Sequence, residues 1–392
     1  MLLIPIVLVI ALVIGIMEWN SHKKHVNALP IRVNVNGIRG KSTVTRLITG
    51  IIKEAGYKTI GKTTGTSARM IYWNTSEEEP IQRRPEGPNI GEQKMVVRKA
   101  AMLGADALVS ECMAVNPDYQ IVFQEKLLQA NIGVIVNVLE DHMDVMGPTL
   151  DEVAEAFTAT IPHNGHLIIS QGPYVDYFKK EAAKRNTKVI VADNSKIPEV
   201  YLRKFDYMIF PENASLALAV AEALDIDEET AFRGMLKAQP DPGAMRIKHL
   251  KQGSKSAYFV NGFAANDPSS TINIWKNVVS QGYSAKSPIV VMNCREDRVD
   301  RTIQFADDVL PHIPMDKLVL IGEKAEPIKN AVRSGRLKVN QIIDLQGKST
   351  DEIYGTLIEI ASNNIIYGIG NVHGAAEPLV EKLQAHTEIG GS

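Results

Sequence analysis

The sequence predicts an α/β protein with two domains, preceded by an apolar N-terminal helix. Patterns typical of short buried strands alternate with helix patterns along most of the 392 residues, as expected for parallel sheets covered by helices. The stretch AQPDPGAM, residues 238–245, interrupts this alternation with prolines and a glycine. With 45% apolar and 22% charged residues, the chain can form two cores. We therefore expect an anchor and linker over residues 1–28, a first domain over 29–243 and a second domain over 244–392.

The first 17 residues, MLLIPIVLVIALVIGIM, carry no charge and lie at the lower limit of length for a membrane-spanning helix. No basic residue precedes this run and no Ala-x-Ala site follows it, so a membrane anchor is favoured over a cleaved signal peptide or a buried helix. Lys23 and Lys24 come next, and the positive-inside rule then places the following domains in the cytoplasm. We expect a single anchor in the cell membrane that contributes nothing to the globular core.

Buried strands are predicted from short apolar runs in both domains. Helix patterns follow many of them, such as the run NASLALAVAEAL that opens at Asn213. The predicted strands are residues 31–36, 106–111, 132–138, 166–170, 188–192 and 207–210 in the first domain, and residues 257–262, 287–294, 317–323 and 364–370 in the second.

Charge and cysteine content exclude several classes of protein. The formal net charge of −2 provides no basic field, so we expect no nucleic-acid partner. The two cysteines, Cys112 and Cys294, lie far apart and have no partners at ligand spacing, which argues against a disulfide framework and a zinc site. This cysteine usage fits the reducing cytosol.

A glycine-rich turn, NGIRGKS, joins the first predicted strand to a helix. Its glycines allow close approach of backbone N–H groups to phosphates, Lys41 would reach the β and γ phosphates, and the Ser42 hydroxyl would bind Mg²⁺. The full Walker pattern would place its first glycine at Val35, so this is a shortened phosphate loop (P-loop). A chance Gly-Lys-Ser in a surface turn is disfavoured by the strand and helix on either side. The residues predicted to bind ATP here are Gly37, Ile38, Arg39, Gly40, Lys41, Ser42 and Thr43.

Acidic and imidazole side chains follow two other predicted strands. Glu111 ends one strand, and the segment EDHMD places His142 between two aspartates after another. Because ligands gather at the carboxyl ends of parallel strands, we predict that Ser42, Glu111 and His142 hold Mg²⁺. Lys41, Glu111 and His142 are the predicted catalytic residues. Taken singly, Glu111 could be a solvated strand end, His142 a neighbour of a helix cap and Cys112 a small buried residue.

The motifs together resemble the Mur ligase and folylpolyglutamate synthetase superfamily. The resemblance rests on the short phosphate loop, Glu111, the segment NVLEDHMD, the segment PENASLALA and, after residue 245, the segment FAANDP. It implies a P-loop central domain, a C-terminal Rossmann-like domain and ATP-dependent amide ligation. Two departures are a membrane anchor in place of the usual N-terminal domain, and Ala265 in place of the family's histidine. The resemblance also implies that Asn213, Arg246 and Asp267 bind ATP.

A closer resemblance is to the ligase subunits of bacterial poly-γ-glutamate synthases, which act in capsule biosynthesis. It is carried by long segments such as GKTTGTSARMIYW, SECMAVNPDYQ, NVLEDHMDVMGPTLDE and GNVHGAAEPL. It implies that the enzyme polymerises glutamate through γ-carboxyl to α-amine links by way of an acyl phosphate. It also implies ATP and Mg²⁺ as cofactors, with glutamate, the polymer, the lipid bilayer and membrane subunits of a synthase and export complex as partners. Homo-oligomer formation stays open.

Binding of a polyanionic substrate calls for arginines, because guanidinium forks match carboxylates. A solvated surface arginine is the alternative for each candidate, and a structural role is the alternative for His373 in GNVHG. The predicted substrate-binding residues are Thr64, Arg69, Arg84, Arg295 and Arg298, and Arg83 is a further candidate.

Two other functions share part of this pattern. A membrane-tethered P-loop ATPase that drives polymer export would need the anchor and the phosphate loop, but not FAANDP or a second Rossmann-like domain. A Mur-type or folylpolyglutamate-type ligase acting on another acceptor would need both domains, but not the anchor.

Many Mur-type ligases carry a carbamylated lysine about one helix after the histidine motif. This chain has no lysine between His142 and Lys179. We therefore predict that activity does not depend on bicarbonate. The measurement is the glutamate-dependent rate in carbon-dioxide-depleted buffer at mildly alkaline pH, before and after bicarbonate is added. Rescue of a depressed rate by bicarbonate would contradict the prediction.

Overall fold

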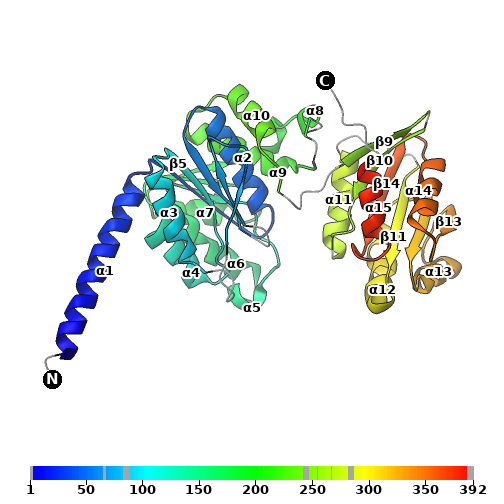
Figure 1. The fold of residues 1–392 in the computed structure, drawn as a ribbon, viewed down its shortest axis with the longest axis horizontal. Helices are drawn as coiled ribbons and strands as arrows, with labels where there is room; N and C mark the ends of the chain where they lie inside the picture. The colour runs from blue at the N-terminus through cyan, green and yellow to red at the C-terminus, as the bar shows by residue number, and fades with distance from the viewer. Residues whose placement is uncertain are drawn as a thin grey trace. The chain divides into compact units, whose positions relative to one another are not determined.

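The chain folds into two compact units in a computed structural model (Figure 1). The first unit comprises Met1–Pro198 and Ile209–Gly243, and the second comprises Glu199–Met208 and Ala244–Ser392. The structure describes residues 3–64, 68–82, 89–202, 204–205, 207–241, 247–253, 255–265, 267–280 and 287–385.

The described part of the first unit is built on an eight-stranded sheet with the order β4-β3-β2-β5-β1-β6-β7-β8. The strands from β2 to β8 in this order are parallel, and β3 and β4 add an antiparallel edge. The parallel arrangement brings the carboxyl ends of β1, β2, β5 and β6 to one edge, which is where ligands bind in such sheets. The bounds are β1 Ile31–Asn36, β2 Thr59–Lys62, β3 Arg69–Tyr72, β4 Glu79–Pro80, β5 Ala107–Glu111, β6 Ile132–Ile135, β7 His166–Ile169 and β8 Lys188–Val191.

Helices cover this sheet and form its cores. In one cluster, Val97 of α3 and Phe123 of the π-helix η1 pack with Leu108 of β5. In another, Val153 of α6 and Phe178 of α7 belong to the cluster that contains residues of β6 and β7. The bounds are α1 Leu3–Asn27, α2 Lys41–Glu54, α3 Glu92–Met102, α4 Pro117–Val122, η1 Phe123–Leu128, α5 Met143–Met146, α6 Leu150–Phe157, α7 Val175–Ala183, α9 Pro211–Ala223 and α10 Glu228–Lys237, with short 3₁₀ turns at Thr158–Thr160 and Asn194–Lys196.

Helix α2, which follows the phosphate loop, is held by close packing against α10. A Cβ placed on Gly50 of α2 would lie 2.4 Å from the carbonyl oxygen of Gly234 in α10, so only glycine allows this approach. On the other side, Thr49 of α2 lies against Gly61 of β2, where a Cβ would come within 2.5 Å of the threonine hydroxyl. These contacts, in the second half of α2, fix the helix relative to the sheet.

The second unit contains a six-stranded sheet with the order β13-β12-β11-β14-β10-β9 in its described part. Strand β9 is antiparallel, the others are parallel, and strand order reverses between β11 and β14. The strands are β9 Ile247–Gln252, β10 Lys255–Asn261, β11 Ile289–Cys294, β12 Lys317–Gly322, β13 Gln341–Asp344 and β14 Asn364–Gly370. The helices are α8 Glu199–Leu202, α11 Pro268–Ser280, α12 Val299–Asp308, α13 Glu326–Arg333, α14 Thr350–Glu359 and α15 Ala376–Ala385, with short 3₁₀ turns at Glu296–Arg298 and Leu310–His312.

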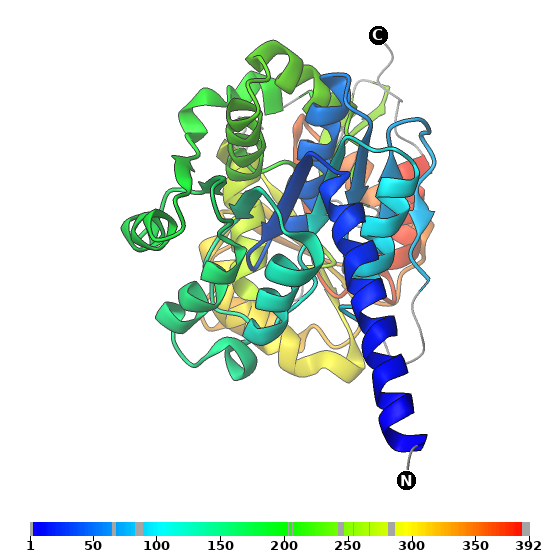
Figure 2. The same cartoon turned by 90° about the vertical axis from the view of Figure 1, so that its left-hand side faces the viewer.

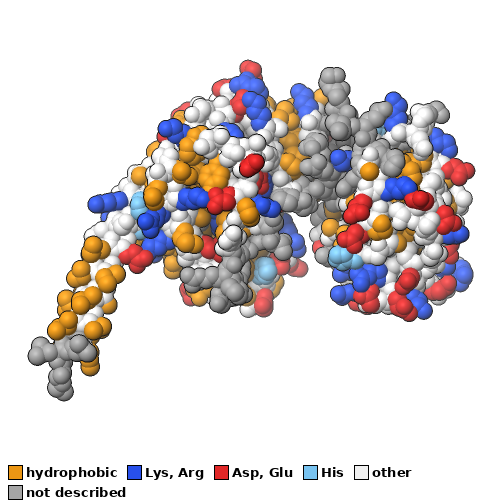
Figure 3. Space-filling model, in the orientation of Figure 1, with side chains coloured by type: hydrophobic (Ala, Val, Ile, Leu, Met, Phe, Trp, Pro, Cys, Tyr) orange, Lys and Arg blue, Asp and Glu red, His pale blue; other side chains and the backbone are white. Residues whose placement is uncertain are grey.

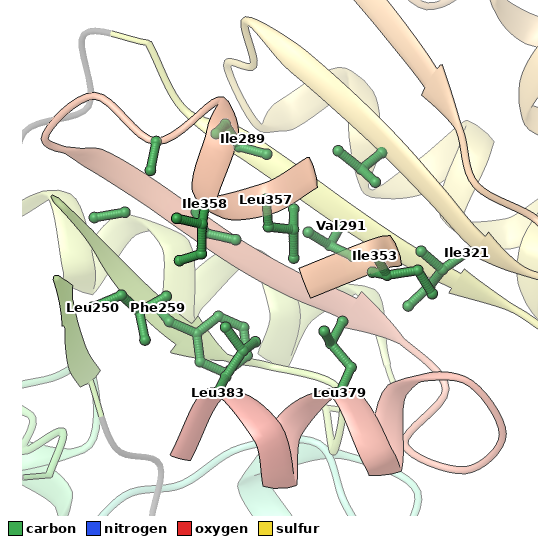
Figure 4. Close-up of a cluster of buried hydrophobic side chains, with 14 of the residues drawn as sticks. Leu250, Phe259, Ile289, Val291, Ile321, Ile353, Leu357, Ile358, Leu379 and Leu383 are labelled. Carbon is green, nitrogen blue, oxygen red and sulfur yellow. The ribbon is translucent and has the colours of Figure 1, made fainter. Parts of the chain in front are cut away.

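The core of the second unit lies between the sheet and helices α14 and α15 (Figure 4). Phe259 of β10 and Val291 of β11 face Leu357 of α14 and Leu379 of α15, and all four side chains are buried. The apolar side chains on this face of the sheet therefore pack against the apolar faces of amphipathic helices.

The predicted strands agree with the structure except at residues 207–210. This segment is buried but forms no strand. Phe210 has extended backbone angles, and Pro211 then starts α9, so the segment is extended without joining a sheet. Strands β2, β3, β4, β9 and β13 were not predicted from the sequence, because they are short or carry few apolar residues.

Helix α1 has two parts with different surroundings. Residues 4–17 are exposed and mostly apolar, and they form the row of hydrophobic side chains along α1 in Figure 3. By length and composition, α1 is the one helix in the described chain that could cross a membrane. Nearer its C-terminal end, Val26 is fully buried and packs with the α3 and η1 cluster.

The expectation that residues 1–28 add nothing to the core is therefore wrong. Trp19, His22 and Val26 follow one another at helical spacing, which puts them on one face of α1. That face contacts α3 and η1, and both His22 and Val26 are buried there.

Two truncations separate the parts of α1. The described side chains that a deletion of residues 1–17 removes are those of residues 4–17, which are exposed, so we expect the free energy of unfolding to change by less than about 0.5 kcal/mol. Deletion of residues 1–28 also removes buried Val26 and His22, and we expect a loss of about 2–5 kcal/mol. Urea denaturation of both proteins measures the difference. Equal stability of the two truncated chains would contradict this packing.

Candidate active site

The phosphate loop connects β1 to α2 through two glycines with left-handed backbone angles. Gly37 has a φ of 129°, and a Cβ there would lie 3.0 Å from the backbone nitrogens of Val136 and Asn137. Gly40 has a φ of 86°, and a Cβ there would lie 2.8 Å from Oδ1 of Asn213. Both positions thus need glycine for backbone angle and for space. The predicted ATP-binding residue Asn213 is buried directly beside the loop.

Asn137 holds the loop in shape from the end of β6. Its Oδ1 accepts hydrogen bonds from the backbone N–H groups of Ile38 at 3.1 Å and Arg39 at 3.0 Å. Its Nδ2 donates to the carbonyl of Arg39 at 2.9 Å. Two predicted phosphate donors, the N–H groups of Ile38 and Arg39, are therefore bonded to protein. The N–H groups in the first turn of α2 have no partner within the helix. They remain available to bind phosphate oxygens at the phosphate loop.

Lys41 lies inside the loop at the start of α2. Its Nζ donates to the carbonyls of Gly37 at 2.8 Å and Ile38 at 3.0 Å. Burial lowers the pKa of this ammonium, and the nearby Glu111 carboxylate acts in the opposite direction. A positive charge is thus placed among backbone groups where phosphate oxygens would bind.

Glu111 is a buried carboxylate at the end of β5, with 3% of its surface exposed. One oxygen, Oε2, accepts hydrogen bonds from Ser42 Oγ at 2.9 Å and from the backbone N–H of Thr64 at 2.8 Å. The structure therefore brings together two of the three predicted Mg²⁺ ligands. A hydroxyl and a carboxylate are hard oxygen donors that suit this ion.

His142, the third predicted ligand, is differently placed. It lies just before α5 with a φ of 51°, and its side chain is 53% exposed. Its backbone N–H donates to Asp141 Oδ1 at 3.0 Å, and Asp141 also pairs with exposed Arg39 at 3.3 Å. Within the described residues, no group of three or more His, Cys, Asp or Glu side chains is arranged to hold a metal. The role of His142 stays a prediction.

A cavity of about 430 Å³ at the carboxyl edge of the sheet is lined by Lys41, Glu111 and His142, whereas Ser42 is not among its lining residues. It lies at the ends of β1, β2, β5 and β6, and segments that follow these four strands line it. The lining residues are Asn36, Gly37, Ile38, Lys41, Thr64, Glu111, Cys112, Met113, Ala114, Val115, His142, Met146 and Phe157.

Of the predicted substrate-binding residues, Thr64 lines this cavity, whereas Arg69 is not among its lining residues. The backbone N–H of Arg69, in β3, donates to Thr63 Oγ1 at 3.2 Å. Arg83, Arg84 and Arg246 lie outside the described residues.

The second unit has a separate cavity of about 480 Å³ at the ends of β11, β12 and β14. Arg295 lines it and forms two hydrogen bonds to Asp297, at 2.9 and 2.7 Å. Arg298 is not among its lining residues and precedes α12. Asp267 precedes α11 and accepts a hydrogen bond from the backbone N–H of Ser270 at 2.8 Å. Their binding roles stay predictions.

Two residues near the first cavity were missed in the sequence analysis. Asn137 interrupts the apolar run IGVIVNV, and a polar amide in such a run is a usable signal. Lys62 ends β2 and is fully buried, with its Nζ 3.9 Å from Sδ of Met113, which lines the cavity. A fully buried lysine is rare and indicates a specific environment.

Comparisons with known proteins identify the family. The Mur ligase middle domain matches residues 35–234, and the poly-gamma-glutamate synthase CapB C-terminal domain matches residues 247–386. Over 386 residues the chain is 66% identical to PGA synthase CapB of Bacillus subtilis (strain 168), covering 98% of each protein. The chain belongs to the CapB family. It is also 65% identical to the capsule biosynthesis protein CapB of Bacillus anthracis, covering 97% of this chain and 82% of that protein.

Solved structures with low sequence identity share the fold of this CapB family member. Folylpolyglutamate synthase from Thermotoga maritima matches with a TM-score of 0.61 and 14% identity, over 94% of this chain and 92% of that one. E. coli FolC in complex with DHPP and ADP matches with a TM-score of 0.57 and 14% identity, over 93% and 91%. The predicted family and the predicted fold class are confirmed.

The fit of Asn213 against Gly40 gives a test of the loop. Replacing Gly40 by Ala would strain the backbone and displace Asn213, so we expect weaker ATP binding. Gly56 is a matched control, since its φ of 91° imposes similar strain but no atom lies within 4 Å of a Cβ there. The backbone strain should cost each variant about 1–2 kcal/mol of stability, and displacement of Asn213 adds to the cost at Gly40 only. Calorimetric titration with ATP should separate them, and equal affinities in the two variants would count against the role of this contact.

Proposed function

We propose that the chain is an ATP-dependent amide ligase that joins glutamate residues from γ-carboxyl to α-amine and so makes poly-γ-glutamate. The proposal rests on one observation above all. Lys41 and the Ser42–Glu111 pair meet at a phosphate loop in a chain 66% identical to a PGA synthase. The ADP complex of FolC, which has the same fold, supports ATP as the phosphate donor.

The first step makes the carboxylate reactive. A γ-carboxylate oxygen of the growing chain attacks the γ phosphorus of ATP, and the bond to the bridging oxygen breaks, giving an acyl phosphate and ADP. The Lys41 ammonium and the first N–H groups of α2 stabilise the charge on the transferred group. Ser42 and Glu111 would hold Mg²⁺, which offsets phosphate charge when bound.

The second step forms the amide. The α-amine of the next glutamate attacks the acyl carbon, the phosphate leaves, and the nitrogen loses a proton. Each link therefore converts one ATP to ADP and phosphate. No protein nucleophile is needed, and the buried thiol of Cys112 is unsuited to be one, because burial raises its pKa to about 11. Positioning and charge stabilisation supply the rate enhancement.

We assign further roles on the basis of chemistry and family. Glu111 and His142 would act at the metal site, Asn213 beside the nucleotide, and Arg295 in the second cavity as a carboxylate-binding residue. Residues 29–243 and 244–392 would be the two catalytic domains, and Arg246 and Asp267 are retained as ATP-binding candidates. Arg69, Arg84 and Arg298 are retained as substrate-binding candidates.

The location of the enzyme is part of the proposal. The exposed apolar part of α1 would anchor the chain in the cell membrane, with both catalytic units in the cytoplasm. Membrane subunits that export the polymer would be its partners.

Two rival functions predict different reactions. An export ATPase would hydrolyse ATP without glutamate, and a ligase for another acceptor would require that acceptor. The test measures phosphate release from ATP by the full chain. The assay is run with L-glutamate or D-glutamate, in the presence of the membrane fraction of the cells that produce the protein. Glutamate-dependent release with an acid-stable amide polymer is expected. Glutamate-independent hydrolysis would favour the export motor, and release that requires another acceptor would favour the other ligase.

Lys41→Ala should reduce glutamate-dependent ADP formation by at least about 100-fold, because it removes the charge beside the transferred phosphate. The fold should be retained, as shown by an unchanged circular dichroism spectrum. Lys53→Ala is the control, since Lys53 is an exposed lysine in the last turn of the same helix. Retained turnover in the Lys41 variant would refute the assignment.

A further inference from the structure

The direction of α1 relative to the first sheet follows from a very short connection. Only residues 28–30 separate α1 from β1, so the two elements run in opposite directions (Figure 2). The backbone N–H of Ile31 donates to the carbonyl of Asp106, just before β5, at the amino edge of the sheet. The C-terminal end of α1 therefore lies at the amino edge, and its apolar N-terminal part points toward the carboxyl edge.

Contacts with α3 place Glu18 near that carboxyl edge. Helix α3 leads into the start of β5, so its first turn lies toward the opposite end of the strands. Lys94, in this first turn, forms an ion pair with Glu18 of α1. Nearby, the ammonium of Lys126 lies 6.0 Å from the ring centre of Trp19. The apolar residues before Glu18 thus extend beyond the edge that carries the phosphate loop.

The angle of α1 is fixed by buried contacts. His22 is 3% exposed, and its Nε2 lies 2.9 Å from the carbonyl oxygen of Leu127 in η1. Arg32 of β1 donates to the carbonyl oxygens of Val26 at 3.5 Å, of Leu29, and of Gln129 at 2.8 Å. A guanidinium at the C-terminal end of a helix satisfies free carbonyls and opposes the negative end of the helix dipole. Helix α1 is therefore held at both ends of its docked part.

The apolar segment is not longer than the thickness of the bilayer core, so none of it remains outside the membrane as a spacer. Residues 3–17 of α1 span about 22 Å, whereas the hydrocarbon core of a bilayer is about 30 Å thick. If this segment spans the membrane, Glu18 and Trp19 must lie at the headgroup layer. The carboxyl edge of the sheet, which lies beside Glu18 and Trp19, must then also lie at the headgroup layer.

We propose that the phosphate-loop edge of the first unit faces the lipid bilayer, so that the amide bond is formed next to the headgroup layer. This inference rests on the proposed anchoring by α1. Orientation comes from the helix rather than from attraction to anionic lipid, because the described residues at this edge include acidic as well as basic side chains. Arg39 is paired with Asp141, and Asp118 and Asp144 also follow strands at this edge. A product leaving the cavity would start its path beside the membrane.

Two variants, each with one introduced cysteine, test the orientation in the full chain in lipid nanodiscs. Val145→Cys places a label at the carboxyl edge, and Met102→Cys places one at the amino edge, where both native side chains are exposed. Native Cys112 and Cys294 are both buried, so labelling is selective for the introduced thiol.

The measurement is fluorescence quenching by a nitroxide on the lipid headgroups. Because α3 alone is about 16 Å long and runs between the two edges, quenching at position 145 should be at least about twofold stronger than at position 102. A flexible Gly-Ser linker inserted between Met17 and Glu18 should remove this difference while the protein still floats with vesicles. Equal quenching in the uninterrupted chain, or stronger quenching at position 102, would overturn the proposal.

The experiments also distinguish failure of the proposed anchoring from failure of the proposed ligase reaction. A full chain that does not float with vesicles would overturn both the anchoring and the orientation. A chain that shows the quenching difference but forms no glutamate-dependent amide would retain the orientation and reject only the ligase reaction.

Discussion

The candidate site depends on the buried carboxylate of Glu111. A carboxylate removed from water is costly unless hydrogen bonds or opposite charges compensate it. Here the hydroxyl of Ser42 and the backbone N–H of Thr64 both donate to Oε2. The side chain thereby joins β5 to the start of α2 and to the segment after β2. Because β1 lies between β5 and β6, the phosphate loop is held between Glu111 on one side and Asn137 on the other.

The two donors to Glu111 are neutral, so its negative charge is only partly compensated. The ammonium of Lys41 is attracted to it, and burial of both groups strengthens that attraction. A hard cation that binds Ser42 and Glu111 would complete the compensation and would be positioned next to phosphate oxygens. The phosphate loop thus places a buried carboxylate and a buried ammonium close together, where the proposed metal and nucleotide would bind.

Much of this site could be predicted from the sequence because parallel strands collect their following residues at one edge. Ser42 and Glu111 are 69 positions apart, yet the pattern of strands was enough to place them together. Asn137 was missed because the amide in its apolar run marks a polar role without naming the partner, and that partner, the phosphate loop, follows from β6 lying beside β1. The segment 207–210 was assigned wrongly because its apolar character reflects burial, not strand pairing. Val26 was overlooked because the long apolar run before it dominated the interpretation of α1.

The path from α1 to the phosphate loop contains no flexible linker in the structure. Three residues join α1 to β1, and β1 runs for six residues into Gly37. Arg32 belongs to β1 and at the same time binds the carbonyl groups at the end of α1. A tilt of α1 would therefore act directly on the strand that carries the loop. A rigid connection of this kind is unnecessary for tethering alone, since any flexible segment would tether equally well. It is what an enzyme requires if its site must keep one orientation toward the bilayer.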